Sequence, residues 1–93
     1  MLRDREDSLR EIRRILQARP LNPEPRKQLF WLVELIYACK KSGISAVVAE
    51  AQLMEDALGK LGEYLETADP NTLRHAEELI HQFSQFLEAI QDP

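Results

Sequence analysis

Two long segments repeat apolar residues every three or four positions, and this repeat constrains the fold more than any other feature of the sequence. Alternating steps of three and four place apolar side chains along one side of an α-helix, as in the a/d seam of helices that pack lengthwise. The turn Thr67-Ala68-Asp69-Pro70 separates the two segments, and so short a connection predicts antiparallel neighbours. The seam positions are Val47, Ala51, Met54, Leu58, Leu61 and Leu65 in the first segment, and Leu73, Ala76, Ile80, Phe83, Leu87 and Ile90 in the second.

Prolines and a glycine mark the ends of two further predicted helices. Leu9, Ile12 and Leu16 share one helix face, and the prolines between residues 20 and 25 end that pattern because proline lacks an amide donor. Pro25 suits the first turn of the next helix, and Gly43 suits its C-terminal end. Strand and hairpin signals are missing. The sequence therefore predicts one all-α domain over residues 1–93, an antiparallel up-down four-helix bundle with helices at about 4–18, 24–42, 46–66 and 70–90.

Details within these helices carry their own predictions. On the second helix we expect a core stripe of Leu29, Leu32, Val33 and Ile36. Ser45 and Asp69 are candidate N-caps of the third and fourth helices. Gly59 and Gly62 lack side chains, and we expect them to permit a close helix crossing.

The composition is that of a folded acidic protein, and it argues against several classes. Of the 93 residues, 44% are hydrophobic, and the net charge is −4. Nucleic-acid-binding proteins usually carry a basic excess, so we expect no nucleic-acid partner. No apolar run approaches the roughly 20 residues of a membrane span, and no signal peptide is recognisable. We therefore expect no membrane insertion and a cytoplasmic location.

Candidates for chemistry are few. His75 and His81 are six positions apart and point in different directions on a helix, so they do not form a two-histidine metal face. Glu78 and His81 form a single Glu-x-x-His pair, whereas a di-iron bundle needs two. Cys39 lies among apolar residues, which favours a buried inert thiol. We expect no enzyme activity, no cofactor and no metal.

Aromatic residues gather on the second predicted helix. Phe30, Trp31 and Tyr37 cannot all occupy one face of it, so some are expected in the core and some on the surface. Trp and Tyr are enriched at interaction hot spots. Core packing of all of them and a docking surface formed by some of them both remain open.

The segment from Leu29 to Leu58 resembles the core of histidine phosphotransfer (HPt) domains, especially those that begin chemotaxis-type histidine kinases. That family carries Phe-Arg-x-x-His-x-x-Lys-Gly on an apolar helix, a glycine ten residues after the histidine, and Leu-Met-Glu or a similar triplet on the next helix. Leu29-Phe30 is similar to the approach to the histidine, Gly43 to the later glycine, and Leu53-Met54-Glu55 to the triplet. The resemblance implies an HPt-like bundle over most of the chain.

The reactive residues of the family are missing. Counting from Gly43 and Glu55, the resemblance puts Val33 at the position of the phosphorylated histidine, Ile36 at the lysine and Tyr37 at the glycine. It therefore implies a degenerate HPt-like module of two-component or chemotaxis-like signalling that binds a response-regulator receiver or a histidine kinase without relaying phosphate. The expected contact residues are Val33, Ile36, Tyr37, Lys40 and Lys41.

Two other functions stay open. One is a structural role as a self-associating bundle, such as a homodimer, or as a helical adaptor such as a secretion chaperone, because the two seams can pair between chains as well as within one. The other is phosphotransfer through His75 or His81, which lie on the wrong helix for the family.

Overall fold

The computed structural model describes residues 5–21 and 24–90 and contains four helices. Helix α1 spans Arg5–Gln17 and α2 spans Pro25–Lys41. Helix α3 spans Ser45–Thr67 and α4 spans Pro70–Ala89. The predicted bounds agree with these to within one residue, except that residue 4, where the first helix was expected to begin, lies outside the described residues.

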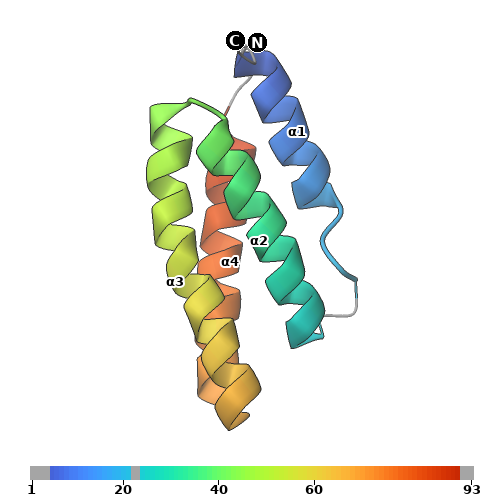
Figure 1. Ribbon diagram of the computed structural model, residues 1–93, viewed down its shortest axis with the longest axis vertical. Helices are drawn as coiled ribbons and strands as arrows, with labels where there is room; N and C mark the ends of the chain where they lie inside the picture. Colours follow the sequence, from blue (N-terminus) through green and yellow to red (C-terminus); the bar gives the residue numbers. More distant parts are fainter. Residues whose placement is uncertain (1–4, 22–23, 91–93) are drawn as a thin grey trace.

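The helices form an antiparallel up-down bundle, as the sequence predicts (Figure 1). Each helix packs on the next one in the chain, and α1 also touches α4. The bundle is elongated, with extents of 42 × 24 × 23 Å. Because α1 is the shortest helix, it lies beside only one half of the bundle, and the far ends of α3 and α4 extend beyond it (Figure 1).

Side-chain hydrogen bonds to backbone atoms hold α1 against α2 at two levels. The indole Nε1 of Trp31 donates to the carbonyl oxygen of Ile15 at 2.7 Å. Near the other end of α1, Ser8 Oγ donates to the carbonyl oxygen of Ser42 at 3.3 Å. Both donors are buried, and a buried donor without an acceptor would be costly, so these bonds fix how α1 is placed.

The core confirms most of the two predicted seams but corrects the stripe on α2. The buried seam residues of α3 and α4 include Val47, Ala51, Met54, Leu61, Ala76, Ile80, Phe83 and Leu87. Leu65, at the end of the α3 seam, is exposed. On α2 the buried apolar residues are Trp31, Leu32, Leu35, Ile36 and Cys39, so the predicted stripe was wrong in including Val33. The core face of α2 is turned toward Trp31 and Leu35 because α1 covers that flank.

The helix ends confirm two predictions and correct two others. Asp69 caps α4, since its Oδ1 accepts from the backbone N–H of Asn71 at 3.0 Å, and Gly43 follows α2 with φ +70°. Ser45 is not the N-cap of α3: Ile44 holds that position, its side chain is buried, and Ser45 begins the helix. Gly59 and Gly62 mark no close crossing, because an added Cβ at either would meet nothing within 4 Å.

Truncating two neighbouring residues tests the orientation of α2. Leu32 is fully buried and Val33 is half exposed. Leu32→Ala is expected to lower the free energy of unfolding by about 2–5 kcal/mol, because it leaves a cavity in the core. Val33→Ala should cost below about 1 kcal/mol, as is usual at surface positions. Chemical denaturation followed by circular dichroism measures both, and equal losses would contradict this orientation.

Candidate functional site

Three apolar side chains stand on the outward side of α2 and form what we call the α2 ridge: Phe30, Val33 and Tyr37. Their exposed fractions are 75%, 48% and 62%. Steps of three and four residues align them along one side of the helix, opposite the buried Leu32, Leu35 and Cys39. Single exposed apolar residues are ordinary, but several in line on one element are typical of interaction sites.

A shallow groove runs beside the ridge, between α2 and α3. Ile36, which is 6% exposed, lies at its base, and the α3 residues that line it are Glu55, Leu58 and Gly59. Ile36 is thus part of the expected contact set, but it forms the floor of the groove and is not an exposed contact. Lys40 pairs with Glu55 across the groove, and Val33 and Tyr37 belong to both the groove and the ridge.

Basic residues lie at both ends of the ridge. Helix α2 carries four basic residues, Arg26, Lys27, Lys40 and Lys41, and one acidic residue, Glu34. The ammonium of Lys41 lies 4.9 Å from the ring centroid of Tyr37, a cation–π distance. Glu34 lies toward α1, where its carboxylate is 3.9 Å from the guanidinium of Arg14. The surface is therefore apolar along its centre and basic at its ends.

Two of these cations are placed where they oppose helix stability. Arg26 and Lys27 lie in the first turn of α2, at the positive end of its dipole, where acidic residues are favoured. Neither has an ion-pair partner among the described residues. The N-cap, Glu24, makes no side-chain capping bond that would offset them. Both side chains are exposed, so their charges are open to solvent.

Of the five expected contact residues, the structure brings Val33, Tyr37, Lys40 and Lys41 together at the surface. Of the aromatic residues, Trp31 is buried against α1, while Phe30 and Tyr37 are exposed. Phe30 was not among the expected contacts, although its spacing of three and seven from Val33 and Tyr37 was a signal that could have found it.

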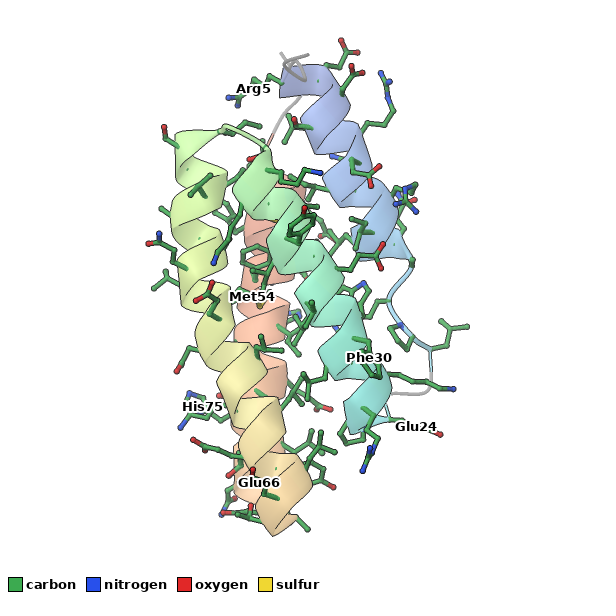
Figure 2. The ribbon with its side chains drawn as sticks, in the orientation of Figure 1. Arg5, Glu24, Phe30, Met54, Glu66 and His75 are labelled. Carbon is green, nitrogen blue, oxygen red and sulfur yellow. The ribbon has the colours of Figure 1, made fainter. Side chains whose placement is uncertain are left out.

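The residues considered for catalysis do not converge. His75 and His81 are exposed on α4, and Figure 2 shows His75 on the outside of the bundle. Within residues 5–21 and 24–90, no three His, Cys, Asp or Glu side chains are grouped so that they could hold a metal ion. None of the described helices has the length and apolar character of a membrane span.

Comparison with known proteins yields no relative. No family model matches the chain, and no curated protein and no solved structure is significantly similar to it. The resemblance to HPt domains therefore depends only on the residues quoted for it above.

Among the described residues, Cys39 combines a strongly shifted pKa with a potentially reactive side chain. Its thiol is completely covered, and burial raises its pKa to about 12 from an ordinary 9.0. The prediction of a buried thiol is confirmed. The thiolate is the reactive form, so the raised pKa agrees with an inert thiol, which stays a prediction.

A thiol-reactive probe tests this burial. At neutral pH the folded chain should react far more slowly than the denatured chain, because reaction requires the bundle to open. Equal rates for folded and denatured chains would contradict the burial.

Cys39 also gives the free energy of unfolding a pH dependence. The unfolded thiol ionises near pH 9 while the folded one stays protonated, so stability is retained below pH 9 and falls as pH rises toward 12. Cys39→Ala should remove the part of the alkaline loss that is due to the thiol.

Proposed function

We propose that this chain is a non-catalytic, HPt-like interaction module that binds a response-regulator receiver or a histidine kinase through the α2 ridge. The observation that carries the proposal is the ridge itself: Phe30, Val33 and Tyr37 are exposed in line on the helix where the resembling family holds its reactive histidine. The exposed apolar side chains of the α2 ridge lower solubility and contribute little to core packing, which favours a role in binding.

The two ends of the resemblance disagree by one residue, and the orientation of α2 bears on the choice. Counting forward from Phe30 puts the histidine position at Glu34 and the lysine position at Tyr37, whereas counting back from Gly43 puts them at Val33 and Ile36. A histidine and a lysine that meet a partner must be accessible. Glu34 and Tyr37 are both exposed, but Ile36 is buried. Exposure of both positions favours the count from Phe30, whereas the spacings of Gly43 and Glu55 favour Val33, so Val33 stays among the proposed contact residues.

Neither count gives a side chain that could relay phosphate in the usual way. A valine has no nucleophile. Glu34 is a carboxylate, and an imidazole is needed at that position. The nearest histidines, His75 and His81, are on α4, which packs on α3 and α1 and not on the outward side of α2. A binding role without transfer is therefore the simplest reading of the site.

The surroundings of the ridge restrict its partner to one with an acidic rim. Arg26, Lys27 and Lys41 lie at the two ends of the ridge, so a matching partner surface is apolar in the middle and acidic around it. Charged rims mainly steer association and select partners, while buried aromatic anchors supply most of the affinity.

Binding measurements with substituted ridges test this function. The probes are isolated receiver domains and histidine-kinase catalytic cores encoded in the same genome, titrated against the labelled chain. Phe30→Ser and Tyr37→Ser should each weaken the binding about tenfold, since aromatic anchors typically contribute at least that much.

Leu21→Ser is the control, because Leu21 is an apolar residue even more exposed than Phe30 (98% against 75%) that lies between α1 and α2 and outside the ridge. It should bind as the unsubstituted chain does. Failure of every receiver and kinase to bind, or equal effects of Leu21→Ser and Phe30→Ser, would contradict the proposal. Acid-labile phosphate on His75 or His81 after incubation with a phosphorylated receiver would replace it with active phosphotransfer.

A further inference from the structure

A second groove lies on the opposite flank of α3, and acidic residues border it, whereas basic residues lie at the ends of the α2 ridge. The α3–α4 groove is lined by Glu50, Gln52, Leu53, Met54, Asp56, Leu79, Gln82 and Phe83. Leu53, which is 65% exposed, stands at its edge, and the buried Met54 and Phe83 form its base. The groove therefore offers an apolar floor with an exposed leucine beside it.

Unpaired carboxylates border this groove. Glu50 and Asp56 line it, and neither has an ion-pair partner among the described residues. The surrounding helices are acidic as well: α3 carries five acidic residues against one lysine, and α4 carries three against one arginine. A segment that fills this groove should be apolar along its centre and basic at its edges.

The α2 ridge has that chemistry. Its centre is Phe30, Val33 and Tyr37, and basic residues lie at both of its ends. We propose that the α3–α4 groove is a second interaction surface whose occupant is the α2 ridge of another copy of this chain. This inference uses the ridge assigned under the proposed function but assigns it a different partner.

Charge disfavours the symmetric alternatives. Two α2 ridges facing each other would bring Arg26, Lys27 and Lys41 of each copy against the same residues of the other, and two α3–α4 grooves would bring carboxylates against carboxylates. Like charges opposed in an interface are costly. The favourable pairing is between unlike surfaces, which is the head-to-tail type of contact.

The α2 ridge and the α3–α4 groove of one chain are accessible at the same time. Glu55 lines the groove on the α2 side of α3, and Leu53 lines the groove on the α4 side, two residues and about 200° apart around the helix. Because α3 separates them, a copy whose ridge is occupied still presents a free groove. Assembly by this contact therefore continues into open chains or closes as a ring.

Two variants, each lacking one surface, test the pairing. The ridge variant is Phe30→Ser with Tyr37→Ser, and the groove variant is Leu53→Lys with Asp56→Lys. All four positions are exposed, so both variants should fold, which circular dichroism and thermal unfolding verify. Mass is measured by light scattering and sedimentation velocity over a wide concentration range, at low and high salt.

The unsubstituted chain is expected to gain mass with concentration, and salt should weaken this gain because it screens the charged rims. Each variant alone should remain a monomer. Mixed together, the two variants should form a 1:1 complex, because one supplies an intact groove and the other an intact ridge. Association of the groove variant alone, failure of the mixture to form a complex, or a monomeric unsubstituted chain at all concentrations would overturn the inference.

The groove variant also separates this inference from the proposed function. Its ridge is intact, so it should bind a receiver or kinase as the unsubstituted chain does. If it binds that partner and the mixture of variants fails, only the self-association is lost. If the mixture forms the complex and no receiver or kinase binds, only the proposed function is lost.

Discussion

The packing of α2 between α1 and α3 decides which of its residues a partner can reach. On one flank, Trp31 is buried and its indole N–H donates to the Ile15 carbonyl at 2.7 Å, so α1 cannot shift without leaving a buried donor unpaired. On the other flank, Ile36 is covered by α3. Of the many apolar residues of α2, those of the α2 ridge stay exposed to solvent. The width and direction of the ridge follow from α1 and α3, which cover the rest of the helix.

The surface of α2 is not arranged for stability. Exposed aromatic side chains such as Phe30 keep most of their area in water, and the first-turn cations Arg26 and Lys27 oppose the helix dipole. Stability comes instead from the core face and from ordinary devices at the helix ends, such as the Asp69 cap. This separation means that substitutions on the ridge can change binding with little effect on folding.

The sequence predicts the bundle well because a repeat of three and four residues is a property of the helix itself, and because Pro25, Gly43 and Asp69 act locally. The stripe it predicts on α2 is wrong at Val33, since apolar residues occur all around that helix and the sequence does not distinguish the covered ones. Which of them are covered depends on where α1 packs, a tertiary effect. The predicted N-cap of α3 is wrong for a related reason. Burial of Ile44 sets where the helix begins, so Ser45 is already its first residue.

The two proposed partners of the α2 ridge would compete. A receiver or kinase and the groove of another copy both need Phe30 and Tyr37, so one ridge can hold only one of them at a time. By mass action, a higher concentration of the chain then leaves fewer free ridges and lowers the apparent affinity for the signalling partner. The occupant of a copy's own ridge does not cover the α3–α4 groove of that copy, because the groove lies on the other flank of α3. Through self-association, the concentration of the chain itself would then regulate how much of the signalling partner it binds.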